Sequence, residues 1–154
     1  MNQPTLLSSQ IRDVVFGKDV KVVQPVNLYE CHIGDNCFIG PFVEIQCNAI
    51  VGNRTRIQSH CFICDGVTIG EDCFIGHGVM FVNDLFKSGG PAAGRKEEWK
   101  SCSIGNGVSI GSNATILGVN ICDDVVIGAG AVVTKNIEKP GVYAGNPAVL
   151  LRSL

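Results

Sequence analysis

A large apolar residue recurs at every sixth position along most of the chain. The period runs through residues 16–28, 33–81 and 104–133, with two five-residue steps, and it makes 18 turns. An α-helix repeats every 3.6 residues and a half-buried strand every two, so neither explains a period of six. A short strand followed by a tight corner does explain it, because Gly, Asn and Asp supply the backbone conformations that such corners need. The pattern therefore predicts many short β-strands separated by corners.

Three strands and three corners close a triangle, and stacked triangles form parallel sheets on three walls, with a coil about every 4.8 Å. Eighteen turns predict six coils in an all-β fold whose interior holds ladders of the large apolar residues. One wall keeps its phase on both sides of residues 82–103, so we interpret these residues as a loop inserted between coils. The residues of that wall are Ile33, Val51, Ile69, Ile104 and Ile121. We expect a solenoid at 16–137, an N-terminal segment at 1–15 and a short C-terminal tail at 138–154.

Composition and charge narrow the class of protein. The 154 residues are 45% hydrophobic and 17% charged, which is typical of one soluble globular domain rather than of a disordered chain. A net charge of −2 leaves no excess of basic side chains for nucleic acid, and no apolar run approaches the roughly 20 residues that span a bilayer. The first ten residues lack the basic and apolar segments of a secretion signal, so the eight cysteines do not indicate a disulfide framework. We expect a protein of the reducing cytoplasm.

The cysteines also raise the question of a metal. Cys61 and Cys64 form a CxxC pair, a spacing found in zinc sites. Cys37, Cys61 and Cys73, however, stand four positions after a large apolar residue, at the second inward position of the repeat. Cysteine at such a position acts as a compact hydrophobe. We therefore expect no metal site.

The repeat resembles the hexapeptide motif of the left-handed parallel β-helix, in the units IGDNCF, IGPFVE, IGEDCF, IGHGVM, IGNGVS and IGSNAT. The ending IGAGAVVTKNI, followed by YAGNPA, is similar to the acyl-CoA-binding end of hexapeptide acyltransferases. FVND, residues 81–84, follows IGHGVM and resembles the FTND stretch of N-acetyltransferases that act on nucleotide-linked 3-amino sugars. Valine replaces threonine at position 82, so a hydroxyl contact there is not expected.

This resemblance implies an acetyl-CoA-dependent N-acetyltransferase of a dTDP- or UDP-linked amino sugar, feeding the assembly of surface polysaccharide such as O-antigen. It also implies a homotrimer, because in such enzymes each CoA cleft lies between adjacent subunits. Backbone N–H groups at two corners are expected to line the pantetheine groove, and Lys135 either approaches a CoA phosphate or is a solvated lysine of the last coil. The cofactor-binding candidates are Gly111, Ala129, Thr134, Lys135, Asn146 and Pro147.

Acetyl transfer needs a neutral acceptor, a donor for the oxyanion and close approach of the two substrates. The loop after Phe81 contains no histidine, which argues against a hydroxyl acceptor, because an alcohol needs a base more than an amine does. The resemblance implies that Asn83 orients the amine or the thioester carbonyl; alternatively, Asn83 opens the loop in an Asx turn. His60 and His77 are 17 residues apart, almost one coil, so we expect them to be neighbours on one edge. They are candidates for a base, for nucleotide contacts or for structural corner residues.

Four further residues are candidate substrate contacts. Glu44 and Gln58 face outward on nearby coils, and Asp84 and Trp99 belong to the loop. The loop either folds over a neighbouring subunit, with Trp99 as its anchor, or is an exposed mobile arm. The alternative functions are an O-acetyltransferase of a sugar or serine hydroxyl, a γ-type carbonic anhydrase and a non-catalytic scaffold. The carbonic anhydrase needs three histidines around zinc, and the two at 60 and 77 lack a third partner.

Overall fold

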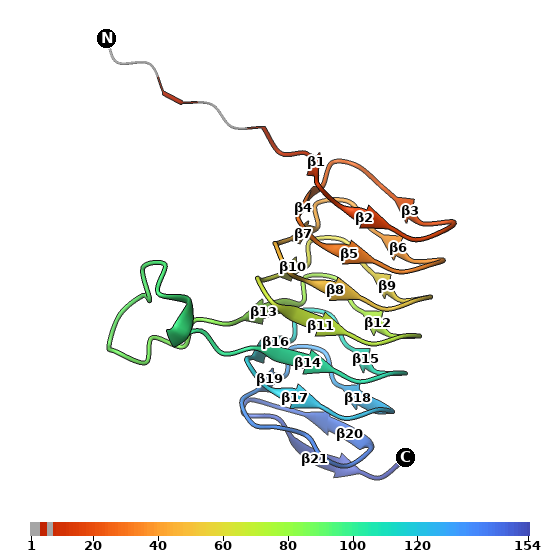
Figure 1. The fold of residues 1–154 in the computed structure, drawn as a ribbon. Coiled ribbons are helices and arrows are strands. Elements are labelled where there is room, and N and C mark those ends of the chain that lie inside the picture. The colour runs from red at the N-terminus through yellow and green to blue at the C-terminus, as the bar shows by residue number, and fades with distance from the viewer. Residues whose placement is uncertain (1–3, 6–7) are drawn as a thin grey trace.

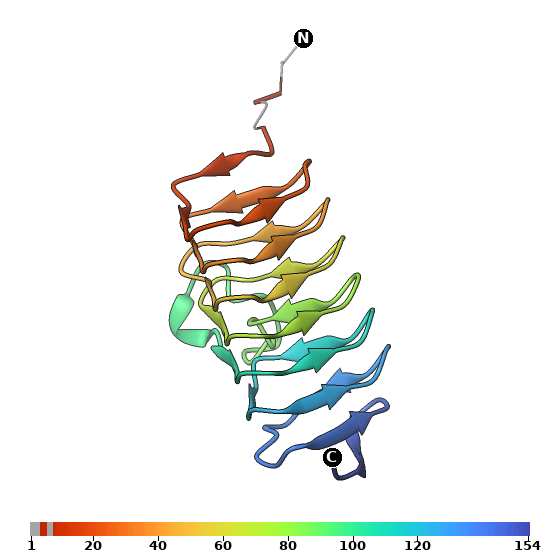
Figure 2. The ribbon, with the colours of Figure 1, turned by 90° about the vertical axis from the view of Figure 1, so that its right-hand side faces the viewer.

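Short parallel strands wind around one axis and form three sheets that run the length of the molecule (Figure 1). The computed structural model describes residues 4–5 and 8–154. Residues 1–3 and 6–7 of the predicted N-terminal segment therefore lie outside the described residues. Successive strands step from the first sheet to the second and then to the third, and the chain descends as a left-handed parallel β-helix (Figures 1 and 2).

Each sheet takes every third strand of the solenoid. The first sheet contains β1 (Ile11–Arg12), β4 (Asn27–Tyr29), β7 (Glu44–Ile45), β10 (Phe62–Ile63), β13 (Met80–Val82), β16 (Thr115–Leu117) and β19 (Val132–Val133). The second contains β2 (Val15–Phe16), β5 (His32–Ile33), β8 (Ile50–Val51), β11 (Val67–Ile69), β14 (Cys102–Ile104) and β17 (Asn120–Ile121). The third contains β3 (Lys21–Val22), β6 (Phe38–Ile39), β9 (Arg56–Ile57), β12 (Phe74–Ile75), β15 (Ser109–Ile110), β18 (Val125–Ile127), β20 (Gly141–Ala144) and β21 (Val149–Arg152).

The predicted all-β fold is confirmed, but six coils are too few: the first sheet has seven strands, because the parallel pairing extends beyond the predicted solenoid at both ends. Strand β1 pairs with β4 before residue 16 is reached, and β20 pairs with β18 after residue 137. The C-terminal tail is thus a hairpin, since β21 returns antiparallel to β20. No helix in the described part of the chain is long and apolar enough to cross a membrane.

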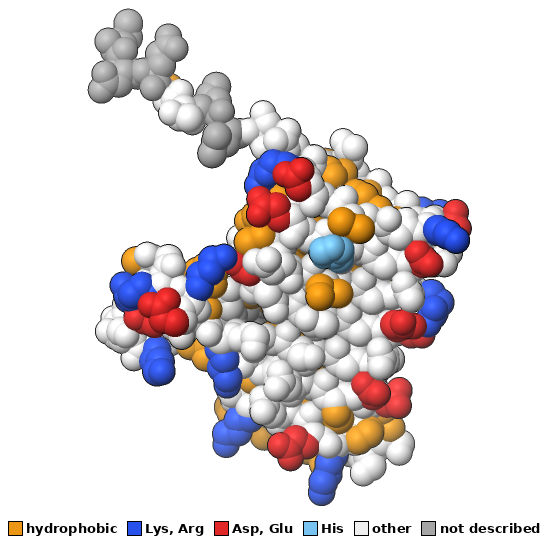
Figure 3. Space-filling model, in the orientation of Figure 1, with side chains coloured by type: hydrophobic (Ala, Val, Ile, Leu, Met, Phe, Trp, Pro, Cys, Tyr) orange, Lys and Arg blue, Asp and Glu red, His pale blue; other side chains and the backbone are white. Residues whose placement is uncertain are grey.

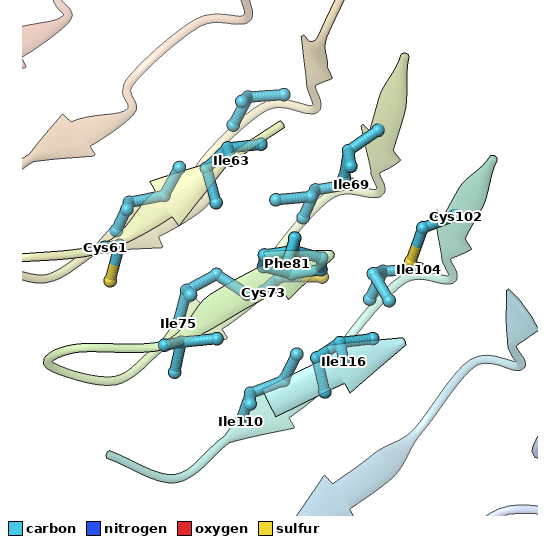
Figure 4. Close-up of a cluster of buried hydrophobic side chains, with 14 of the residues drawn as sticks. Cys61, Ile63, Ile69, Cys73, Ile75, Phe81, Cys102, Ile104, Ile110 and Ile116 are labelled. Carbon is cyan, nitrogen blue, oxygen red and sulfur yellow. The ribbon is translucent and has the colours of Figure 1, made fainter. Parts of the chain in front are cut away.

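The interior holds the predicted ladders of large apolar side chains. Ile57, Ile75 and Ile110 pair in register on successive coils, and each is 0% exposed. Figure 4 shows Ile75 and Ile110 among the buried side chains. Burying a side chain of this size contributes about 1.5–3 kcal/mol. The stacked isoleucines therefore supply most of the driving force that holds one coil on the next.

The second inward position of the repeat is occupied by small side chains that also satisfy corner carbonyls. Thr55 is fully buried; its Oγ1 donates to the carbonyl of Gly70 at 2.8 Å and accepts from the N–H of Cys73 at 3.0 Å. One coil before it, the Cys37 thiol donates to the carbonyl of Gly52 at 3.1 Å. Cysteine at this position is thus a compact core residue that also donates a hydrogen bond, and the eight cysteines are free thiols.

Corners join the sheets along three edges. The loop edge joins the first sheet to the second and includes residues 46–48, 64–66 and 118–119. The asparagine edge joins the second sheet to the third and includes residues 34–36, 52–54 and 105–107. The histidine edge joins the third sheet to the first and includes residues 58–60, 76–78, 111–113 and 128–130.

The asparagine edge explains why glycine follows the large apolar residue in so many repeats. Asn53 Oδ1 accepts from the backbone N–H of Asp35 at 2.8 Å, and Asp35 Oδ1 accepts from the N–H of Lys18 at 2.7 Å. A Cβ on Gly34 would lie 2.5 Å from Asn53 Oδ1, so any other residue would displace this acceptor. The corner sequence Gly-Asp/Asn is therefore one interlocking unit repeated down the edge.

The inserted loop leaves the stack at the loop edge, between β13 and β14, and projects away from the body (Figure 1). Strands β13 and β14 occupy the ends of the predicted range 82–103, so the loop itself covers residues 83–101. It contains one short 3₁₀ turn, η1 (Lys96–Glu98). Strands β11 and β14 pair as adjacent coils, which confirms that the loop is an insertion rather than a break. On the face seen in Figure 3, charged side chains gather on the loop and along the edges and are sparse on the sheet between them.

Candidate functional site

Polar side chains gather on the loop edge, next to the root of the inserted loop. Asp65, in the corner between β10 and β11, lies at their centre. Its Oδ2 accepts from Lys96 Nζ of the loop at 2.6 Å and from the Cys47 thiol at 3.2 Å, and its Oδ1 accepts from Asn48 Nδ2 at 2.9 Å. Only 11% of the Asp65 side chain is exposed. Burial alone would raise the pKa of this carboxyl, but the hydrogen bonds from Lys96, Asn48 and Cys47 outweigh burial and lower it.

Asn83 lies one coil below Asp65, where the loop begins. Its Nδ2 donates to the backbone carbonyl of Asp65 at 3.4 Å, and its own carbonyl accepts from the N–H of Lys100 at 2.9 Å. Within the described residues, Asn83 Oδ1 accepts no hydrogen bond. The half-buried carboxamide therefore has a nitrogen that donates to the corner and an oxygen whose hydrogen-bonding capacity is unused in the described residues.

The Asx turn that opens the loop is formed by Asp84 and not by Asn83. Asp84 Oδ1 accepts from the N–H of Phe86 at 3.0 Å, and Oδ2 accepts from the N–H of Ala92 at 2.7 Å. Both carboxylate oxygens of this predicted substrate contact are thus engaged by the backbone of the loop. Trp99 is half-buried, with Lys96 Nζ 5.6 Å from the centre of its ring. It lines a hollow of about 410 Å³ within the loop, together with Leu85 and the stems of neighbouring charged residues.

A chain of hydrogen bonds connects Glu44 to this edge. Gln46 Nε2 donates to Glu44 Oε1 at 3.0 Å, and Gln46 Oε1 accepts from the N–H of Asp65 at 3.2 Å. Burial and the negative charge of Glu44 raise the pKa of Tyr29, so its phenol stays protonated at neutral pH. The structure thus brings Glu44 and Asn83 to one polar edge.

Sequence reasoning missed most of this edge. The missed residues are Gln46, Cys47, Asn48, Asp65 and Lys96. The place of four of them could have been predicted from the number of residues in a coil. Residues 48, 65 and 83 are 17 and 18 positions apart, about one coil each time, and so share one edge. The contact of Lys96 with Asp65 could not be predicted, because the sequence of the loop follows no period.

The two predicted histidines and Gln58 lie on the histidine edge, across the first sheet from Asn83. His77 Nδ1 lies 2.9 Å from Ser59 Oγ, and the ring of His60 packs on Phe42 with 4.8 Å between ring centres. The two histidines therefore share an edge, as expected, but His60 contacts Phe42 and His77 contacts Ser59 rather than each other. Within one chain the structure does not bring them to Asn83.

The predicted cofactor residues divide between two edges. Gly111 and Ala129 stack on the histidine edge, and a Cβ on Gly111 would lie 2.4 Å from the nitrogen of Ala129. The N–H groups of Ser112 and Ala129 make no hydrogen bond within the described residues, whereas matching N–H groups on the asparagine edge, those of Lys18, Asp35, Glu71 and Asn106, donate to side chains. Further down, Asn146 and Pro147 follow β20 and are joined by a cis peptide bond. Thr134 and Lys135 are exposed on the loop edge, after β19.

No three His, Cys, Asp or Glu side chains in the described ranges lie close enough together to hold a metal ion. The cysteines of the CxxC pair point into the core. Burial raises the pKa of Cys61 to about 11 and of Cys64 to about 12, which keeps both thiols protonated.

Comparison with known families decides the nature of the repeat. The model described as bacterial transferase hexapeptide (six repeats) matches residues 30–65, and the hexapeptide repeat of succinyl-transferase matches residues 66–80 and 102–135. These matches together cover more than half of the chain; they leave out the inserted loop and resume after it. The chain belongs to the hexapeptide-repeat family.

Individual members of the family match over different shares of their length. Galactoside O-acetyltransferase of Escherichia coli (strain K12) is 49% identical over 53 residues, 34% of this chain and 26% of that protein. The chain matches only 24% to 28% of the length of the curated relatives. A hexapeptide-repeat acetyltransferase from Vibrio cholerae O1 biovar eltor, solved with acetyl coenzyme A, has a TM-score of 0.67 at 28% identity, covering 80% of this chain and 70% of that one. AntD, an N-acyltransferase from Bacillus cereus solved with dTDP and coenzyme A, has a TM-score of 0.80 at 19% identity, covering 90% and 83%, a likeness of fold.

Proposed function

We propose that the protein is an acetyl-CoA-dependent N-acetyltransferase whose acceptor is the amino group of a nucleotide-linked amino sugar. The observation that carries the proposal is the root of the loop. Asn83 offers an open carboxamide oxygen beside a well-ordered polar edge, and the loop contributes no histidine that would act as a base. An amine suits this arrangement because it can lose its proton to water.

The chemistry follows from these groups. The lone pair of the neutral amine attacks the thioester carbon, the carbon–sulfur bond breaks, and CoA leaves as a thiolate that takes up a proton. The nitrogen releases its own proton to water. Asn83 Oδ1 accepts an N–H of the amine and aims the nitrogen lone pair at the acetyl group. Holding the two substrates within about 3.5 Å supplies much of the rate enhancement.

The pantetheine arm is assigned to the lower half of the histidine edge. The N–H groups of Ser112 and Ala129 are free to donate to its amide carbonyls, and Gly111 leaves the backbone uncovered. Lys135 and Thr134 lie on the loop edge, so we assign them to a CoA phosphate bound by the neighbouring subunit, and we assign Asn146 and Pro147 to the end of the groove. Acetyl-CoA is the co-substrate in this assignment.

A homotrimer completes the site. The proposed CoA groove and Asn83 lie on different edges of one chain, separated by the first sheet. A neighbouring subunit that presents its loop edge to the histidine edge of this one brings the two together. In that arrangement Gln58, His60 and His77 face the acceptor across the interface, with Glu44 and Trp99 contributed by the partner's loop side.

The acceptor is proposed to be a dTDP- or UDP-linked 3-amino sugar made in the cytoplasm for surface polysaccharide. The resemblance of FVND at 81–84 to the FTND stretch supports the amine position, and AntD, which shares the fold, was solved with dTDP. O-acetylation of a hydroxyl is the second candidate. It is favoured by the 49% identity of one segment to galactoside O-acetyltransferase, and it would require His60 or His77 as the base.

The deciding experiment measures thiol release from acetyl-CoA with dTDP- and UDP-linked 3-amino and 4-amino sugars, and with galactoside and serine hydroxyls. Release with an amino sugar alone, lost in Asn83→Ala and kept in the control Asn120→Ala, supports the proposal. Asn120 is exposed at the start of β17 in the second sheet, and its side chain makes no hydrogen bond in the described residues. Thiol release with hydroxyl acceptors alone would establish O-acetylation. If the protein does not bind CoA at all, the proposal is refuted in favour of a non-catalytic scaffold.

A further inference from the structure

The inserted loop is tied to the body by one side chain beyond its root. Lys96 Nζ reaches Asp65 Oδ2 at 2.6 Å across 31 positions of sequence. No other loop side chain after Asn83 hydrogen bonds to the β-helix in the described part of the molecule. Among side-chain hydrogen bonds after Asn83, this ion pair alone joins the outer loop to the body in the described residues.

The loop is internally cross-linked, so that a single attachment can hold all of it. Arg95 Nε donates to Glu98 Oε1 at 2.5 Å, and Ser88 Oγ donates to Glu98 Oε2 at 3.1 Å. The carboxylate of Asp84 binds two backbone N–H groups of the loop. Restraining Lys96 thus restrains the segment that carries Trp99.

Asp65 is itself held from the coil above. Cys47 and Asn48 donate to its carboxylate, and Gln46 accepts from its backbone N–H. The backbone carbonyl of Asp65 binds the carboxamide nitrogen of Asn83. One corner residue therefore contacts both the outer loop, through its side chain, and the loop root, through its carbonyl.

We propose that Asp65 is a positioning residue, which fastens the inserted loop through Lys96 and so keeps Asn83 and the acceptor side of the site in one arrangement. The kinetic part of this inference rests on the proposed function, whereas the fastening of the loop does not. Asp65 binds no substrate in this assignment; it acts through Lys96 and Asn83. Misplacement of a positioned group by about 1 Å can cost up to a hundredfold in rate.

The protein provides its own probe, because Trp99 is the single tryptophan and lies in the loop. In Asp65→Asn we expect the fluorescence anisotropy of Trp99 to fall and its quenching by acrylamide to rise. The matched control is Arg54→Met, which breaks an ion pair of similar length, Arg54 Nε to Asp72 Oδ1 at 2.7 Å, on the asparagine edge. That control should leave Trp99 unchanged.

Steady-state kinetics supply the second measurement. With an active acceptor, Asp65→Asn should lower kcat/KM for the acceptor by on the order of tenfold to a hundredfold and leave the KM for acetyl-CoA unchanged. Unaltered Trp99 anisotropy and quenching in Asp65→Asn would overturn the inference. If that variant does not fold, Lys96→Gln tests the same pair from the loop side against Lys87→Gln. If Asp65→Asn alters the anisotropy and quenching of Trp99 but the wild-type protein acetylates no acceptor, the proposed function is refuted, whereas the inference that Asp65 fastens the loop stands.

Discussion

Replacing Thr55 by valine tests whether the second inward position is a hydrogen-bonding site or only a space to be filled. Valine has the shape of threonine and is more hydrophobic, so packing alone predicts no loss of stability. In the structure, however, the Thr55 hydroxyl is bonded to the carbonyl of Gly70 and to the N–H of Cys73, and all of it is buried. Each buried group left without a partner costs about 1–3 kcal/mol, so we expect Thr55→Val to lose roughly 2–5 kcal/mol.

Thr55→Ser provides the matched comparison. Serine keeps both hydrogen bonds and loses one methyl group, which costs about 1 kcal/mol. Urea unfolding followed by circular dichroism measures the two midpoints, which convert to free energies if the slopes agree. Thr68→Val on the exposed face of β11 is the control and should lie within about 0.5 kcal/mol of wild type. A valine variant as stable as the serine variant would refute the role of the hydroxyl.

Three other outcomes are expected from the groups described above. Burial raises the pKa of Cys61 to about 11, so its thiolate fraction at pH 8 is about a thousandth, and the other buried cysteines behave alike. A colorimetric thiol reagent should therefore modify at most two cysteines in the native protein at pH 8 and all eight after denaturation. The reactivity of the native protein should rise with pH. Rapid modification of a third cysteine at pH 8 would contradict the structure. The two half-buried thiols are Cys47 and Cys122. Lys135→Ala should raise the KM for acetyl-CoA about tenfold without changing that of the acceptor, while Lys139→Ala should change neither; equal effects would remove Lys135 from the CoA site. For an amine acceptor, His60→Asn and His77→Asn should keep the wild-type pH–rate profile, and loss of its acidic limb in either variant would establish a histidine base, because a base must be deprotonated to act.

The regular part of the structure could be predicted from sequence because one short pattern is repeated under the same physical demands. The spacing from Ile33 to Phe81 specifies which side chains face inward, and the wall that keeps its phase from Ile69 to Ile104 identifies the insertion. The hairpin of β20 and β21 was not predicted, because it follows the antiparallel pairing of the tail and not the six-residue period.

The candidate site was predicted partly from a resemblance and partly from the period. Asn83 was proposed because FVND at 81–84 resembles the FTND stretch, whereas the spacing of His60 and His77 correctly predicts that they share an edge. Their individual partners, Phe42 and Ser59, depend on side-chain directions at corners, which the period does not specify. The fastening of the loop by Lys96 depends on a fold of the loop that no repeat encodes.

The register between β11 and β14 determines which part of the sequence can vary without disturbing the β-helix. These strands pair as if no residues separated Val82 from Cys102, so the nineteen-residue excursion places no demand on the ladders above and below it. A different segment grafted at the same corner would meet the same two anchoring strands and the same buried isoleucines. The loop and the solenoid are therefore structurally separable parts of this chain, and the sequence of the loop can change while the solenoid is inherited unchanged.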